Sequence, residues 1–185
     1  MNWSDISLVW VAERATGITG LVLLSLSTFL GAVLSAGWRS PRFPEVRSVS
    51  LHRNISLMTL VFVLLHVVAA IADQYVQIPL ASAIIPFTAD YKMIWVGLGT
   101  IAFDLLLAVL ITSYLRDKIN PRLWRLIHDL TYILWAVATI HTLGAAYERS
   151  LTFITAALGV LLVVPTVILR YTRPHQRPEL KETSR

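Results

Sequence analysis

Five long apolar runs dominate this sequence and limit what it can fold into. Each has at least 19 residues, and they cover Ala15–Trp38, Leu51–Ala72, Met93–Leu115, Leu123–Ala146 and Leu151–Leu169. At a rise of about 1.5 Å per residue, an α-helix of this length crosses the ~30 Å hydrocarbon layer of a bilayer. The runs do not alternate between apolar and polar residues, and open sheets are not stable in lipid. The sequence therefore predicts an all-α integral membrane bundle with five transmembrane helices.

The composition agrees with a membrane protein and narrows the chemistry. Hydrophobic residues make up 56% of the chain and charged residues 15%, too few to cover the surface of a soluble domain. The chain has no cysteine, which excludes disulfides, thiolate metal sites, iron–sulfur clusters and covalently attached haem. The net charge of +5 is typical of nucleic-acid binding as well as of membrane proteins, so the positions of the basic residues must decide.

Those positions predict how the helices are oriented, and they argue against a nucleic-acid partner. Of the 16 Lys and Arg residues, 13 lie on one side of the five spans, and only Arg14, Lys92 and Arg149 lie on the other. The positive-inside rule places the richer side in the cytoplasm. We therefore expect a multi-pass protein of the cell membrane, in contact with lipid, with its N-terminus outside and its C-terminus in the cytoplasm.

The chain is expected to form one membrane domain, residues 1–173, followed by a polar cytoplasmic tail, residues 174–185. The segment Asp73–Lys92 is too short and too rich in proline to span, but too apolar for a solvated loop. We expect it to lie in the interface or to fold over the bundle. No glycine-rich phosphate loop occurs, so no flavin or nicotinamide site is evident in this chain.

Four histidines lie inside two predicted spans, His52 and His66 in the second and His128 and His141 in the fourth. Because both spans run in the same direction, His52 and His128 are expected near the cytoplasmic face, and His66 and His141 near the outer face. Imidazole is a good iron ligand, and a haem between two helices could take one axial histidine from each. Zinc or copper would be left with too few ligands at either depth. The alternative to haem ligation is that these histidines only form hydrogen bonds with hydroxyl or carbonyl groups. His175 is expected to be an ordinary solvated residue.

The spacings raise a geometrical problem in the fourth span. Fourteen residues separate His52 from His66, which leaves the two side chains within about 40° of each other on an ideal helix. Thirteen residues separate His128 from His141, which leaves them about 140° apart. The fourth helix should therefore be tilted, contain a local bulge, or bind its haems from different faces.

The two histidine pairs on alternate spans resemble the ferric reductase-like transmembrane domain family, which includes NADPH oxidases and ferric reductases. The resemblance implies two b-type haems, one held by His52 and His128 and the other by His66 and His141. Arg14 resembles the arginine that the oxidases place near their outer haem. The oxidases have a further histidine where this chain has Ala70, which argues against superoxide production. They also continue into a flavin and nicotinamide domain.

Five further side chains are candidates with two readings each. Arg53 and Arg125, like Arg122, are placed to neutralise the propionates of an inner haem, but a role in topology alone also explains them. Asp104 lies inside the third span, where a carboxyl group must be paired or protonated. It could hold a ligand histidine or bond to a hydroxyl on a neighbouring helix, and its depth favours the second reading. Trp135 either lies between the haems or packs in the core.

Three functions remain open from the sequence. The first is a di-haem b, cytochrome b-like electron-transfer subunit, an oxidoreductase component that takes electrons from a separate cytoplasmic flavoprotein reductase and delivers them to an acceptor at the outer face. The second is a haem b subunit that takes electrons from a quinol and serves an extracytoplasmic reductase. The third is a haemless transport or assembly protein, in which the histidines are polar contacts or a proton path.

Overall fold

The computed structural model describes residues 8–37, 45–146 and 149–172, and within them every regular element is helical. The elements are α1 (Leu8–Ser35), α2 (Glu45–Ala72), η2 (Leu80–Ala83), α3 (Met93–Tyr114), η3 (Arg116–Lys118), α4 (Pro121–Asp129), α5 (Thr131–Ala145) and α6 (Arg149–Thr172). Five stretches are long and apolar enough to cross a membrane, with α4 and α5 together forming the fourth. The all-α fold with five candidate membrane spans is therefore confirmed. The tail, residues 174–185, lies outside the described residues.

Several helices begin earlier than the apolar runs that predicted them. Helix α1 begins at Leu8 rather than Ala15, and α2 begins at Glu45 rather than Leu51. Hydropathy detects only the part of a helix that matches the hydrocarbon layer, whereas polar residues at the interface also adopt helical geometry. The extra turns place Glu13 and Arg14 on helical backbone close to His66, one of the two histidines of α2.

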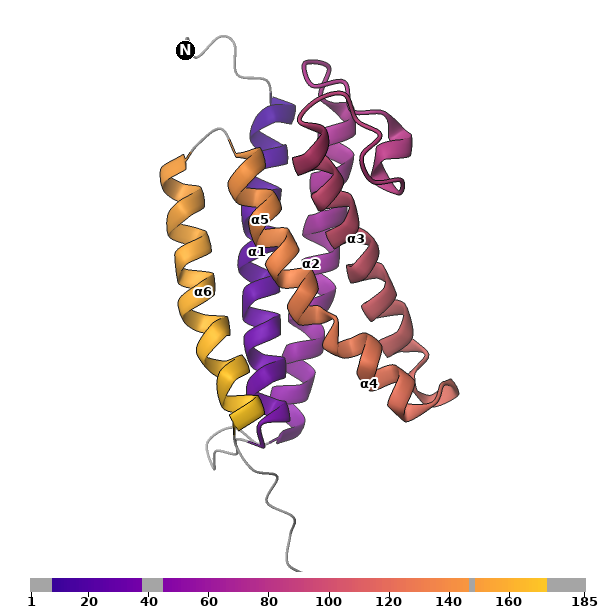
Figure 1. The fold of residues 1–185 in the computed structure, drawn as a ribbon, viewed down its shortest axis with the longest axis vertical. Helices are drawn as coiled ribbons and strands as arrows, with labels where there is room; N and C mark the ends of the chain where they lie inside the picture. The colour runs from indigo at the N-terminus through magenta and orange to yellow at the C-terminus, as the bar shows by residue number, and fades with distance from the viewer. Residues whose placement is uncertain (1–7, 38–44, 147–148, 173–185) are drawn as a thin grey trace, which may run out of the picture.

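The fourth span is not the continuous helix expected over Leu123–Ala146. Helix α4 ends at Asp129, Leu130 lies between the helices, and α5 starts at Thr131. The Thr131 hydroxyl donates to the His128 carbonyl at 2.6 Å, and helical bonding resumes where Leu134 N donates to Leu130 O at 2.8 Å. Figure 1 shows α4 turning away from the line of α5. Of the three possibilities for this span, a local irregularity is the one observed.

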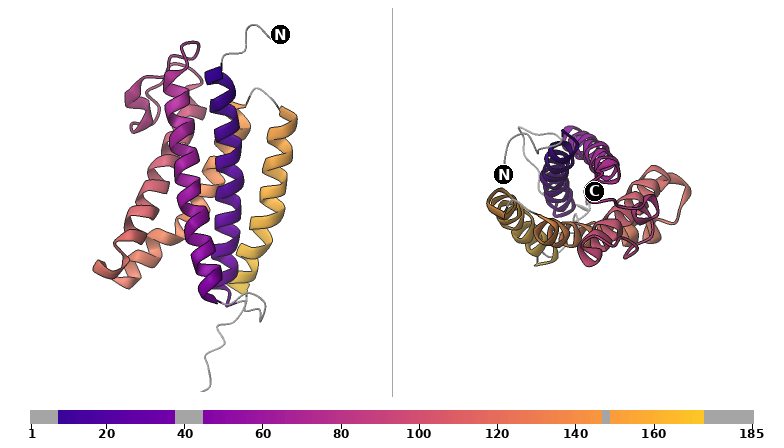
Figure 2. Two further views of the ribbon diagram at one scale, coloured as in Figure 1. Left: turned by 180° about the vertical axis from the view of Figure 1, so that it is seen from behind. Right: turned by 90° about the horizontal axis from the view of Figure 1, so that it is seen from above.

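Helix α1 lies at the centre of the bundle, against α2, α5 and α6, while α3 packs mainly on α5 (Figure 2). The buried core cluster contains residues of α1, α3, α5 and α6, namely Leu24, Ala102, Leu106, Leu134, Trp135 and Val163. Below, the Leu8 end and the Ser35 end denote the two ends of the bundle at which α1 begins and ends.

The segment Asp73–Lys92 folds over the Leu8 end, which is one of its two expected positions. Ser82 and Ala89 in it are buried, and the Thr100 hydroxyl of α3 donates to the Ser82 carbonyl at 2.6 Å. A Cβ atom added to Gly97 would lie 2.2 Å from Phe87 Cδ1, so only glycine lets this ring pack on α3. The segment therefore covers the Leu8 half of one face of α3.

One interhelical hydrogen bond inside the core gives a testable stability contribution. The indole N–H of Trp135 donates to Ser25 Oγ at 2.9 Å, and that hydroxyl donates to the Leu21 carbonyl. Ser25→Ala would leave the buried indole N–H unpaired, and we expect it to destabilise the protein by about 1 kcal/mol. Unfolding in detergent measures this. Thr155→Ala, which removes a hydroxyl bonded within α6, is the control and should change stability little. Equal effects of the two substitutions would contradict the expectation.

Candidate cofactor site

The four membrane histidines meet in two pairs at two depths. The rings of His52 and His128 have their centres 6.3 Å apart, and those of His66 and His141 are 6.2 Å apart. The first pair joins α2 to α4 at the Ser35 end, and the second joins α2 to α5 at the Leu8 end. In each pair the ring planes are steeply inclined, at 74° and 72°. The structure thus brings together the residues that the spacing pattern pairs.

The break at Leu130 allows both pairings. On a continuous helix, thirteen residues would place His128 and His141 about 140° apart around the axis. Because α4 and α5 are separate helices with different directions, both histidines face α2. No sequence signal located the break, since Leu130 is neither glycine nor proline.

In all four histidines Nδ1 has a hydrogen-bond partner. The Nδ1–H groups of His66, His141 and His52 donate to the carbonyls of Glu13 at 2.8 Å, Trp95 at 2.7 Å and Ser27 at 3.0 Å, respectively. Nδ1 of His128 lies 3.2 Å from Ser113 Oγ. A backbone carbonyl can only accept, so these bonds fix the proton on Nδ1 and leave Nε2 as a lone-pair donor. That is how proteins orient a metal-binding imidazole.

Small residues on α1 and α3 make room for the rings, and those on α1 repeat with the spacing of the two histidines of α2. A Cβ on Gly17 would lie 2.9 Å from His66, one on Gly31 3.2 Å from His52, and one on Gly99 2.7 Å from His141. In each case the accepting carbonyl belongs to the residue four positions before the glycine. Gly17 and Gly31 are 14 residues apart, as are Gly99 and Ser113. Sequence reasoning did not connect these glycines with the histidines, although Gly17 and Gly31 have the same 14-residue spacing as His52 and His66.

An apolar cavity of about 980 Å³ lies beside the pair at the Leu8 end. Its lining includes His66, His141, Phe103 and Leu134. The volume is at the upper end of the usual range for cofactor and ligand sites, which are mostly apolar with a few polar groups. The cavity is therefore large enough for a sizeable planar group between the two imidazoles.

The predicted arginines differ in position. Arg14 lines this cavity, as does Lys92, and the Arg14 guanidinium lies 4.1 Å from the centre of the Trp10 ring. Lys92 Nζ also donates to the Ala145 carbonyl at 2.9 Å. Arg53 and Arg125 are exposed residues of α2 and α4, at the Ser35 end. Arg14 alone among the three predicted arginines is thus placed against the cavity.

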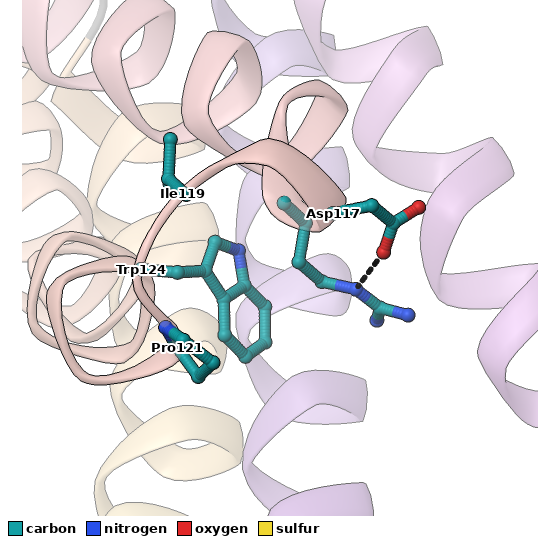
Figure 3. A pocket seen from close by; sticks show the side chains of 5 residues that line it. Asp117, Ile119, Pro121 and Trp124 are labelled. Atoms are coloured by element: carbon teal, nitrogen blue, oxygen red, sulfur yellow. Dashed lines mark ion pairs between the residues drawn. The ribbon is translucent and has the colours of Figure 1, made fainter.

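At the Ser35 end, sequence reasoning missed an aromatic contact. The Trp124 indole stacks on His128 with ring centres 5.1 Å apart and planes inclined by 26°, one helical turn along α4. Trp124 also lines a surface pocket of about 430 Å³ with Arg116, Asp117, Ile119 and Pro121 (Figure 3). The Trp124 indole N–H is buried without a hydrogen-bond partner among the described residues. The four-residue spacing of Trp124 and His128 was the available signal.

A second feature near His128 was also missed. Arg170 of α6 pairs with Asp129 at 2.7 Å and donates a further hydrogen bond to the Tyr132 hydroxyl. In the sequence, Arg170 was used only as one of the 13 basic residues that predict the orientation of the spans. Its contacts tie α6 to α4 and α5 at the break, directly beside His128.

Asp104 and Trp135 both lie away from the histidines. Asp104 makes no hydrogen bond or ion pair with any residue that the structure describes, and it does not line the cavity. Neither of its two expected roles is therefore observed. Trp135 packs in the core against Gly159 and Ser25, whereas Leu134 lines the cavity. The packing role is the one that the structure supports for Trp135.

The donor set fits an iron macrocycle better than a bare metal ion. Two metal–nitrogen bonds of about 2 Å, plus the ~1 Å from each nitrogen to its ring centre, add up to roughly 6 Å, which the observed separations match. Among residues 8–37, 45–146 and 149–172, no group of three or more His, Cys, Asp or Glu side chains could hold a metal. Two imidazoles per depth therefore suit a metal whose other ligands come from a haem.

Comparison with known proteins gives one match. The sequence fits the family described as ferric reductase like transmembrane component over residues 16–139, about two thirds of the chain. That range includes His52, His66 and His128 and ends two residues before His141. None of the curated proteins matches the sequence significantly.

Proposed function

Because this chain belongs to the ferric reductase-like transmembrane component family, we propose that it is a di-haem b subunit that moves electrons across the membrane. His52 and His128 hold one haem, and His66 and His141 hold the other. The observation that carries this proposal is the repeated geometry of two facing imidazoles, each with Nδ1 occupied and Nε2 available.

The chain's own residues position the two groups and control their surroundings. A bound haem supplies one-electron iron chemistry, whose potential depends on ligation, hydrogen bonding and burial. The carbonyls of Glu13, Trp95 and Ser27 hold three rings in one tautomer, which makes Nε2 more basic. The apolar lining beside His66 excludes water. The two histidines of α2 lie ~21 Å apart along that helix, so the pairs occupy separate layers.

The direction of transfer follows from the basic residues. We assign the Ser35 end to the cytoplasm, because Arg47, Arg53, Arg116 and Arg125 lie there. Arg39 and Arg42, which also contribute to the asymmetry, lie outside the described residues. Electrons then enter at the His52–His128 pair and leave at the His66–His141 pair, toward ferric iron or another outer acceptor.

A topology reporter tests this orientation. A phosphatase or fluorescent reporter fused after Arg185 should show only cytoplasmic-type activity, and the same reporter before Met1 should show external-type activity, because the basic excess retains the C-terminal side inside. Phosphatase and fluorescent reporters fused at the same position of the chain control for differences in expression. External-type activity after Arg185 would reverse the orientation and the direction of transfer.

Electron entry is expected to require a partner. No flavin or nicotinamide site is evident in this chain, so purified protein should not oxidise NADH or NADPH unaided. The basic residues Arg116, Lys118, Arg122 and Arg125 would attract an acidic reductase surface, and raising the salt concentration should slow the encounter. Stopped-flow haem reduction by NADPH, with and without added flavoprotein, checks this. Rapid reduction by flavin-free protein and nicotinamide alone would contradict it.

One observation favours a quinol as the donor instead. The pocket is largely apolar and is lined by Trp124, which stacks on His128. The Trp124 indole N–H is buried and has no hydrogen-bond partner among the described residues. A quinone carbonyl is a suitable acceptor for that N–H. In this second candidate function the chain draws electrons from the quinone pool and serves an extracytoplasmic reductase. Reduction by a short-chain quinol, lost in Trp124→Ala, distinguishes the two donors.

Reconstitution tests the function itself. Proteoliposomes that enclose dithionite should reduce external ferricyanide when they carry the wild-type chain, and not when they carry His66→Ala or are empty. Intact vesicles are verified by an enclosed dye. Equal rates with wild-type and His66→Ala protein would contradict transmembrane electron transfer through the paired histidines.

A further inference from the structure

Asp104 occupies the middle of a membrane span. It lies 11 residues from Met93 and 10 from Tyr114, the two ends of α3, which places it ~16 Å from either end. In a hydrocarbon layer of ~30 Å, that is close to the bilayer centre. A carboxyl group is unfavourable at this depth unless another polar group pairs with it.

This chain provides no such pairing group among its described residues. The Asp104 carboxylate has no hydrogen bond or ion pair there, and its side chain is half-buried. On an ideal helix it lies about 140° around α3 from Gly99, which contacts His141. Asp104 is therefore on the face of α3 directed away from the histidines, and the electron-transfer site does not account for it.

The face around Asp104 is open in its Ser35 half. In the Leu8 half, Phe87 covers Gly97, so the segment that folds over the bundle protects α3 there. Toward the Ser35 end, Ala108 follows Asp104 by one turn, and Ile111, 55% exposed, completes the strip. Helix α3 packs mainly on α5 and α4, which lie on its other side. Asp104, Ala108 and Ile111, here the Asp104 strip, form a surface whose middle residue, Ala108, is small enough for a helix to approach closely.

A second copy of this chain is poorly suited to the Asp104 strip. In the described parts of its spans, the Lys and Arg residues lie near helix ends and none lies at the depth of Asp104. Two copies related by a two-fold axis would bring one carboxylate against another. Thr112, the nearest hydroxyl on that side of α3, already bonds to the carbonyls of Ala108 and Val109.

We propose that the Asp104 strip binds a transmembrane helix of a different membrane protein, and that a Lys or Arg of that helix pairs with Asp104 at the bilayer centre. The pairing satisfies both charges, which neither helix could carry alone in lipid without cost. Ala108 permits close approach, and Ile111 provides apolar contact. This interaction is separate from electron entry at the Ser35 end and does not depend on bound haem.

Site-specific photocrosslinking in native membranes tests the proposal. Benzoylphenylalanine in place of Ala108 should give one discrete adduct, and the same group in place of Leu161, an exposed residue of α6, should not. Asp104→Leu and Asp104→Asn should each lower the adduct at least tenfold. Mass spectrometry should identify a protein whose crosslinked span contains a Lys or Arg. Asp104→Lys combined with the reverse charge change in that partner should restore the adduct.

The other outcomes overturn the proposal. They are an adduct of twice the mass of this chain, adducts with lipid alone, a partner span without Lys or Arg, and an adduct that persists in Asp104→Leu. Purified Asp104→Leu should keep the wild-type melting temperature and absorption spectrum. A large loss of either would show that Asp104 stabilises this chain internally, which also contradicts the proposal.

Discussion

Replacing either histidine of one pair should remove one haem and leave the other. We expect His66→Ala or His141→Ala to lose the haem at the Leu8 end, and His52→Ala or His128→Ala to lose the haem at the Ser35 end, each with about half the wild-type haem per chain. The reason is that each pair provides both protein ligands at its depth, and the ring-centre separations of 6.2 and 6.3 Å leave room for one metal. Visible and electron paramagnetic resonance spectra should each lose one of two low-spin components.

Two controls separate ligation from misfolding. His175→Ala, which changes the histidine predicted to be solvated, should keep both haems. Added imidazole should enter the space left in His66→Ala and restore part of the lost signal, because a free imidazole can replace the missing ligand. The pairing is wrong if His66→Ala retains two low-spin haems.

Adding a single methyl group to α3 should have nearly as large an effect. The Cβ of Gly99→Ala would lie 2.7 Å from His141 Cε1, so the ring must move and lose its bond to the Trp95 carbonyl. Loss of such a supporting bond typically weakens metal binding about tenfold or more. Alanine is a better helix former than glycine by about 1 kcal/mol, so the helix itself should not weaken. We therefore expect Gly99→Ala to lose most of the haem at the Leu8 end.

A graded series of glycine variants makes this prediction specific. Gly17→Ala places its Cβ 2.9 Å from His66, and Gly31→Ala places it 3.2 Å from His52, a distance that a small shift relieves. Haem content and reduction potentials should change most in Gly99→Ala, less in Gly17→Ala and least in Gly31→Ala. If haem content and reduction potentials changed equally in the three variants, the role of these glycines in making room for the histidine rings would be contradicted.

Much of the architecture could be predicted because membrane helices have a strong sequence signal. The length of the apolar runs identified the five spans, and the common direction of the second and fourth predicted which histidines meet. The break at Leu130 could not be located, because it depends on how α4 packs on α3, and α5 on α3 and α1, rather than on a helix-breaking residue. The angular mismatch of His128 and His141 nevertheless indicated that some irregularity was needed.

The parts of the site that were missed are contacts between spans distant in sequence. The carbonyl partners of His66 and His141 lie 53 and 46 residues away. Because every residue has a backbone carbonyl, the residue type does not reveal which one accepts such a bond. Arg170 was counted toward topology because its contacts with Asp129 and Tyr132 arise only when α6 returns beside α4. Gly17 and Gly31 are the exception, since they are 14 residues apart, as His52 and His66 are, and this shared spacing could have been read directly from the sequence.

The central claim, that each chain holds two b-type haems between its histidine pairs, is tested most directly by pyridine haemochrome analysis of purified protein with its concentration determined independently. The claim predicts two haem b per chain in the wild type and one in His66→Ala. A wild-type preparation from haem-replete cells that contains one haem per chain, or none, would contradict it.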